Sequence, residues 1–135
     1  MDVFSREKRS EIMSRISGKD TRPELVVRSL LHQLGYRFRL HRADLPGKPD
    51  IVLPGRKKAI FVHGCFWHGH QSCARSRRPS SNESFWSAKL DKNMIRDKGN
   101  VLALESLGWR VKVIWTCEVR DLVTLQEELI SFLES

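Results

Sequence analysis

The sequence has no hydrophobic run long enough to cross a membrane, and its charged first fifteen residues contain no apolar segment typical of a secretion signal. It has only three cysteines in 135 residues, and it has no internal repeat, low-complexity tract or domain linker. Three cysteines cannot all pair, so the chain does not fit a disulfide framework. We therefore expect a cytoplasmic protein without a membrane segment, folding as a single domain over residues 1–135 around a buried core.

Positive charge is concentrated in the middle of the chain. The net charge is +8, and residues 51–100 carry ten basic and three acidic residues, whereas residues 101–135 are net acidic. A basic surface attracts polyanions and releases their counterions on contact, which makes nucleic acid the leading partner. The alternative from charge alone is a basic protein whose charges only keep it in solution.

Hydrophobic spacing and turn residues predict four helices and four strands. The expected helices cover residues 5–16, 21–34, 85–107 and 122–133, and the expected strands cover residues 36–42, 50–53, 59–62 and 109–115. The first two strands are close enough to pair as a hairpin, whereas the helix between the last two requires a parallel crossover. The predicted fold is an α/β protein with a mixed central sheet and helices on both of its faces.

Histidine and cysteine are concentrated in one loop, residues 63–73, which holds three of the five histidines and two of the three cysteines. The spacing of Cys65, His70 and Cys73 suits a zinc loop, and Cys117 could supply a fourth ligand from the end of a distant strand. His63 and His68 are left over, either as packed or surface histidines or as groups that take part in chemistry. The basic loop that follows, with Arg75, Arg77 and Arg78, either lies along phosphates or is simply solvated.

Glu24 and Asp50 each have a structural and a chemical interpretation. Glu24 follows Thr21 at capping-box spacing, so its carboxylate is either a helix cap or a functional acid. Asp50 opens a strand, where turn aspartates are common, but His63 closes the next strand, and in an antiparallel pair these ends meet. A carboxylate there suits Mg²⁺, and the imidazoles of His63 and His68 can activate water or stabilise charge on a phosphate. The combination favours metal-assisted phosphodiester hydrolysis.

Several stretches together carry a family resemblance. The most specific is the run His-Gly-Cys-Phe-Trp-His at residues 63–68, preceded by Phe61 and Val62. The other matching stretches are Leu45–Asp50, Phe85-Trp86, Lys89, Lys92-Asn93, Arg96-Asp97, Leu107–Val111, Trp115–Glu118 and the N-terminal Arg9, Met13 and Asp20–Glu24. On these residues the chain resembles the very short patch repair (Vsr) mismatch endonucleases over roughly residues 6–120.

The resemblance implies a restriction-endonuclease-like fold and an Mg²⁺-dependent enzyme. Family members nick one DNA strand 5′ of the thymine in a T:G mismatch, which arises when 5-methylcytosine deaminates. By residue match, Asp50 would bind Mg²⁺ together with the backbone carbonyl of Val62, and His68 would be the general base. His63 and Glu24 would be supporting catalytic groups.

Four further groups of residues follow from the same resemblance. A structural zinc ion would be bound by Cys65, His70, Cys73 and Cys117. Phe66 and Trp67, with Met13 on the opposite side, would wedge into the base stack beside the mismatch. Asn93 and Asp97 match a helix that supports the site, and residues 1–20 would form a basic helical arm that contacts DNA.

The chain departs from the family pattern within the ligand loop and the adjoining strand. Val62 stands where a threonine is usual, which costs little if only its backbone carbonyl meets the metal. The loop between His70 and Cys73 is one residue longer than the usual pattern, and Gly69 replaces a histidine. These changes leave the four predicted zinc ligands in place.

Three functional hypotheses follow. The first is a strand-specific mismatch nicking endonuclease, the second a restriction-like nuclease that needs no mismatch, and the third a zinc-stabilised DNA-binding module without catalysis. A binding module has no need of the acids and histidines described above, which argues against the third hypothesis. For the first, we expect a monomer acting on double-stranded DNA with a T:G mismatch, with mismatch-repair proteins and a companion cytosine-5 methyltransferase system as candidate partners.

Overall fold

The computed structural model describes residues 21–70, 73 and 83–135. The helix predicted for residues 5–16, the wedge residue Met13 and the basic loop residues Arg75, Arg77 and Arg78 lie outside the described residues. Within the described part of the chain, no helix is both long enough and apolar enough to cross a membrane.

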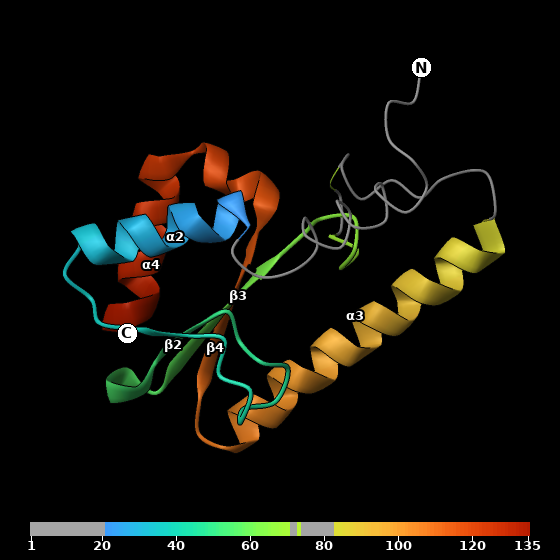
Figure 1. Cartoon of the computed structure of the whole chain (residues 1–135), viewed down its shortest axis with the longest axis horizontal. Coiled ribbons are helices and arrows are strands. Elements are labelled where there is room, and N and C mark those ends of the chain that lie inside the picture. Colours follow the sequence, from blue (N-terminus) through green and yellow to red (C-terminus); the bar gives the residue numbers. More distant parts are fainter. Residues whose placement is uncertain (1–20, 71–72, 74–82) are drawn as a thin grey trace, which may run out of the picture.

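The centre of the fold is a four-stranded mixed sheet in the order β1-β2-β3-β4 (Figure 1). The strands are β1 (Arg39–Leu40), β2 (Ile51–Leu53), β3 (Lys58–His63) and β4 (Arg110–Trp115). The β1–β2 and β2–β3 pairs are antiparallel, whereas β3 and β4 are parallel and joined through a helix. The predicted hairpin and the predicted parallel crossover are therefore both confirmed.

Strand β1 is much shorter than the strand predicted for residues 36–42. Only Arg39 and Leu40 pair with β2, because the next residue, His41, turns into the left-handed backbone region at φ 48°. Tyr36 and Phe38, which gave the alternating pattern, instead pack against the hydrophobic core. The alternation predicted the burial of Tyr36 and Phe38, but it was wrong for Leu40, which is 40% exposed, and for the length of the strand.

In the part of the chain that the structure describes, three α-helices cover the two faces of the sheet (Figure 1). Helices α2 (Arg22–Gln33) and α4 (Leu122–Glu134) pack on one face, and the long helix α3 (Glu83–Ser106) crosses the other. Alternate strand residues point to opposite faces, so Ile51 and Ile60 meet α2 and α4, whereas Val52 and Phe61 meet the α3 side.

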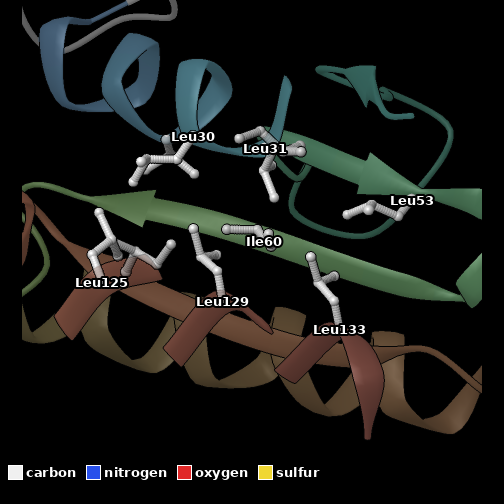
Figure 2. Packing of buried hydrophobic residues seen from close by; sticks show 10 residues of the cluster. Leu30, Leu31, Leu53, Ile60, Leu125, Leu129 and Leu133 are labelled. Carbon is white, nitrogen blue, oxygen red and sulfur yellow. The ribbon is translucent and has the colours of Figure 1, made fainter. Parts of the chain in front are cut away.

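The larger hydrophobic core lies between the sheet and helices α2 and α4 (Figure 2). Leu125, Leu129 and Leu133 recur every four residues along α4 and form its buried stripe. They face Ile60 of β3 and Leu31 of α2, and all five side chains are almost fully buried. Burying side chains of this size stabilises the fold by about 1.5–3 kcal/mol each, before the entropy cost of ordering the chain.

The predicted capping box at the start of α2 is wrong. Thr21 is the N-cap residue, but its side chain makes no capping hydrogen bond. The Glu24 side chain is only 2% exposed and contacts Arg28 and His41 instead of the helix start. The carboxylate is thus directed away from the helix end and into the cleft described below.

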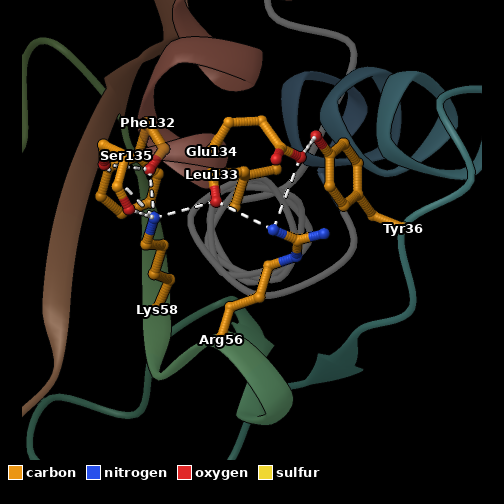
Figure 3. A network of polar contacts seen from close by, with 7 residues as sticks. All are labelled: Tyr36, Arg56, Lys58, Phe132, Leu133, Glu134 and Ser135. Carbon is orange, nitrogen blue, oxygen red and sulfur yellow. Dashed lines mark hydrogen bonds and ion pairs between the residues drawn. The ribbon is translucent and has the colours of Figure 1, made fainter.

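The last turn of α4 is attached to the sheet by polar contacts that are buried or partly buried (Figure 3). Lys58, the first residue of β3, donates from Nζ to the backbone oxygens of Phe132, Leu133 and Ser135 at 2.5, 2.9 and 2.9 Å. Arg56 donates to the Leu133 carbonyl at 3.1 Å. These cations satisfy carbonyls that a helix C-terminus leaves without an intrahelical partner.

Candidate active site and metal centre

A cleft lined by both ionisable and aromatic side chains lies at the C-terminal end of β3. Its walls come from the start of α2, the turn that leads to Asp50, the end of β3, the loop at residues 64–68 and one side of α3. Asp50, Val62, His63, His68 and Glu24 all line it, so the structure brings the predicted catalytic residues around one space.

The first group in the cleft contains Glu24, His41 and Asp50. One ligand atom from each residue lies within 4.8 Å of the others, a spacing that a single cation can bridge. Asp50 is fixed by a hydrogen bond of 2.8 Å from the backbone N–H of Val62 to its Oδ2. Glu24 is fixed by an ion pair with Arg28 and by Nε2 of His41 at 3.1 Å.

Burial and neighbouring groups have opposite effects on the pKa of Asp50. Burial raises the pKa of this carboxyl above its usual range, while the Val62 N–H and the nearby His41 and His68 act in the opposite direction. A divalent cation would stabilise the charged carboxylate that burial disfavours. The hard oxygen donors of Asp50 and Glu24 therefore fit Mg²⁺ in chemical type.

The second group contains His63, His68 and Asp97. The imidazole rings of His63 and His68 are stacked, with centroids 3.9 Å apart and planes 4° from parallel. Nδ1 of His68 lies 2.5 Å from Oδ2 of Asp97. An aspartate in this position fixes the tautomer of the ring and leaves Nε2 of His68 able to accept a proton.

His63 has the more buried imidazole of the stacked pair. Burial, reinforced by the adjacent His68, lowers the pKa of His63 to about 4. His63 is consequently neutral near pH 7 and does not add a second positive charge when its stacked neighbour takes up a proton. This pairing suits one histidine as a base and the other as a neutral support.

Helix α3 holds this half of the cleft in place. Asn93 and Asp97 are four residues apart, so their side chains lie on the same face of α3. Asp97 contacts His68, and Nδ2 of Asn93 donates to the backbone oxygen of Trp67 at 3.1 Å. Both residues thus bind the loop that carries the aromatic and histidine side chains.

The predicted zinc ligands lie close together behind the histidine pair. Atoms of Cys65, His70, Cys73 and Cys117 lie within 4.8 Å of one another, and Sγ of Cys117 is 3.5 Å from Nδ1 of His70. The three cysteines form no disulfide. Tetrahedral zinc places its ligand atoms roughly 3.3–3.8 Å apart, so the donor type, number and spacing fit a closed structural site.

The pKa values of Cys65 and Cys117 are also consistent with a cation bound between the cysteines. Burial opposes ionisation of Cys65, but hydrogen bonds from Thr116 and Cys117 lower its pKa to about 7 overall. Burial and the neighbouring Cys65 sulfur raise the pKa of Cys117 to about 12. Several thiolates this close repel one another, and a divalent cation would allow them to ionise together.

Trp115 contacts both the candidate zinc ligands and the histidine pair. Its indole stacks on His70 with centroids 4.2 Å apart and planes 8° from parallel. It also meets His63 edge-on at 5.5 Å, since these two residues are paired in the β3–β4 register. The candidate zinc ligand and the candidate catalytic histidine therefore share one aromatic neighbour.

Phe66 and Trp67 belong to an aromatic cluster that lines the cleft and to neither hydrophobic core. They meet at 5.1 Å and pack against Trp86 of α3 at 5.5 and 5.9 Å. Nζ of Lys89 lies 5.3 Å from the Trp67 ring centroid. Both rings are half-buried, so part of their surface faces the cleft.

The sequence reasoning missed His41, Arg28 and Trp115. His41 occupies the polar side of an alternating pattern and is seventeen residues from Glu24, so no local spacing indicated their contact. Arg28 lies four residues after Glu24, and that helical spacing could have predicted the ion pair. Trp115 is the last residue of β4 and was described only as part of a hydrophobic strand and a matching stretch.

Comparisons with known proteins agree with the resemblance found in the sequence. The family described as "DNA mismatch endonuclease Vsr" matches residues 1–75. The chain is 51% identical over 133 residues to the type II nicking enzyme V.XorIIP of Xanthomonas oryzae pv. oryzae, covering 98% of this chain and 97% of that one. It is 39% identical over 130 residues to the DNA mismatch endonuclease Vsr of Escherichia coli, covering 96% and 83%.

A solved structure is also similar. The catalytic domain of the homing endonuclease I-Bth0305I matches with a TM-score of 0.57 and 24% identity, covering 84% of this chain and 94% of that one. At this identity the likeness concerns the fold, an arrangement of sheet and helices shared with a nuclease domain.

Proposed function

Since this chain belongs to the DNA mismatch endonuclease Vsr family, and is thus an endonuclease, we propose that it nicks one DNA strand 5′ of the thymine in a T:G mismatch with the help of Mg²⁺. The observation that carries the proposal is the cleft itself. A carboxylate group with the donors of a hard cation and an aspartate-oriented histidine line the same space. Metal-assisted phosphodiester hydrolysis can use both kinds of group, one to hold the cation and one to take the proton of the attacking water.

In the proposed reaction, Asp50 and the backbone carbonyl of Val62 would hold Mg²⁺, with Glu24 and His63 as supporting groups. When bound, Mg²⁺ polarises the scissile phosphate and stabilises the leaving oxygen. His68 accepts a proton at Nε2 from the attacking water, and the Asp97 carboxylate stabilises the imidazolium that forms. His63 stays neutral beneath the His68 ring because burial disfavours its protonated form.

Phe66 and Trp67 are proposed to open the base stack beside the mismatch, with Met13 acting from the opposite side. Their position in the lining of the cleft, outside both cores, supports this role. Inserting an apolar wedge costs a few kcal/mol for each unstacked step, and a T:G wobble pair lowers that cost. Preference for a mismatch over a matched pair would then come partly from how easily the step opens.

We propose a structural zinc ion at Cys65, His70, Cys73 and Cys117, because four protein ligands leave no open position for substrate. The remaining proposals concern the whole chain. Residues 1–135 would act as one domain and as a monomer, with residues 1–20 as a DNA-contacting arm. A companion cytosine-5 methyltransferase and mismatch-repair proteins are proposed partners, since deaminated 5-methylcytosine is the expected source of the substrate.

The proposal is tested with strand-labelled duplexes that differ only in one base pair, T:G or T:A. The expected result in Mg²⁺ is a single nick 5′ of the mismatched thymine, no nick in the T:A duplex and no reaction in EDTA. Equal cleavage of both duplexes would favour a restriction-like nuclease. Tight binding without any cleavage in Mg²⁺ would favour a DNA-binding module.

A further inference from the structure

His41 has a backbone conformation that is uncommon outside glycine. Its φ of 48° lies in the left-handed region, which is uncommon for residues other than glycine and costs free energy unless other contacts stabilise it. One such contact is the hydrogen bond of 3.1 Å from its backbone N–H to the carbonyl oxygen of Asp50. The kink therefore ends the β1–β2 ladder at the residue next to the candidate metal ligand.

The side chain of His41 faces the cleft and contacts the second carboxylate. Its Nε2 lies 3.1 Å from the Glu24 carboxylate, and the two side chains are 13% and 2% exposed. An ionised carboxylate can only accept hydrogen bonds, so Nε2 is the donor and the ring needs no positive charge to make this contact. Arg28 pairs with the same carboxylate.

We propose that His41 is a positioning residue of the carboxylate site, which sets the separation of Glu24 and Asp50 and thereby the affinity of the site for a divalent cation. The His41 ring contacts the Glu24 carboxylate, and the His41 backbone N–H donates to the Asp50 carbonyl oxygen. His41 follows Glu24 by seventeen residues and precedes Asp50 by nine, so this one residue connects two acids that are distant in sequence. This inference rests on the proposed function, in which Asp50 binds the cation.

Without the His41 ring, Arg28 would still pair with Glu24 and could draw it away from Asp50. The two carboxylates would then no longer lie within reach of a single cation. Groups that orient metal ligands typically contribute about 10–100-fold to metal affinity. The effect should therefore appear in the metal concentration that the protein needs, and not only in the maximal rate.

Two substitutions separate the side-chain contact from the backbone conformation. In H41N, asparagine tolerates the left-handed conformation well, but its amide is too short to reach the position of Nε2. In H41Q, the longer amide places a donor near that position. We would measure Mn²⁺ binding to the DNA-free protein by electron paramagnetic resonance, together with the Mg²⁺ concentration that gives half-maximal nicking.

The expected result for H41N is a rise of about 10–100-fold in both metal concentrations, with H41Q within a few-fold of the unmodified protein. Zinc content and the thermal unfolding midpoint would confirm that both variants fold. Unchanged metal concentrations in H41N, or equal losses in the two variants, would overturn the inference. Asp50→Ala separates the two claims, because retained Mn²⁺ binding and nicking in that variant would instead refute the proposed metal site.

Discussion

Lys58 and His63 occupy the two ends of strand β3, and both are nearly fully buried, at 3% and 6% exposed. Lys58 donates to backbone oxygens at the end of α4, so its polar atom is satisfied mainly by a helix end (Figure 3). His63 instead lies among ionisable and aromatic side chains, stacked on His68 and beside Trp115.

The surroundings, and not burial alone, distinguish the two ends. The Lys58 end stabilises the attachment of a helix to the sheet. The His63 end keeps several groups close together whose charges depend on one another and on bound cations, which is the usual condition of an active site. We therefore expect substitutions at the Lys58 end to change stability and substitutions at the His63 end to change catalysis. The candidate zinc ligands are the exception, because they lie near the His63 end but should stabilise the fold.

That exception should give the largest effect. Cys117→Ala removes one of four ligands, so we expect zinc loss and a much less stable protein, because the binding free energy of a structural zinc ion is also folding free energy. Metal analysis by mass spectrometry and thermal unfolding would measure both. Chelation of the unmodified protein should reproduce the change, and a Cys117→Ala variant that keeps zinc and normal stability would contradict the assignment.

The next largest effect is expected at the proposed base. His68→Ala should lower the nicking rate by about 10²–10⁴-fold, the range typical of general-base removal, with little change in unfolding. Single-turnover nicking of the T:G duplex would measure it. His32→Ala, at an exposed histidine in α2, is the matched control and should act like the unmodified protein. Equal rates for the two variants would remove His68 from the mechanism.

A pH-dependent difference in stability is expected at His63. Its folded pKa of about 4 is below the unfolded value near 6.5, so on acidification the unfolded chain takes up the proton first. The stability contribution is complete above pH 6.5 and is lost as the pH falls to about 4, by as much as about 3 kcal/mol.

Urea unfolding of the unmodified protein and of His63→Gln between pH 4 and 7 would isolate this contribution, since all other groups titrate in both. The unmodified protein should lose more stability on acidification than the variant does. Parallel losses across this pH range would show that His63 titrates normally in the folded state.

The smallest effect is expected at the opposite end of the strand. Lys58→Met should lower the free energy of unfolding by about 1–3 kcal/mol, because it leaves buried helix carbonyls without a donor. Nicking per folded molecule should be unchanged. Lys57→Met, at the exposed neighbouring lysine, is the control and should leave stability nearly unaltered. A large loss of specific activity in Lys58→Met would break the distinction between the two ends.

The sequence predicted what depends on local patterns. Hydrophobic runs located β2, β3 and β4, and the helix between β3 and β4 predicted their parallel pairing. Soft ligand types in one loop identified Cys65, His70 and Cys73, and the structure brings Cys117 to them from the turn that follows β4. These features need only spacing, residue type and chain connectivity.

Contacts between distant segments were harder to predict. Lys58 follows two basic residues and lies just outside the strand predicted for residues 59–62, and nothing in its vicinity indicates that α4 ends beside it. Glu24 fitted a capping box, but its buried position near His41 gives the carboxylate a different partner. In both cases the tertiary fold supplied partners that outweighed the local preference.

The central claim is that the cleft at the end of β3 is the nicking site, and Asp50→Ala tests it most directly. The matched control is Asp44→Ala, at an exposed aspartate of the same turn whose carboxylate pairs with Arg42. Both variants should fold, bind the T:G duplex and retain zinc. We predict that Asp50→Ala produces no nick in Mg²⁺ while Asp44→Ala nicks normally; near-normal nicking by Asp50→Ala would contradict the assigned site.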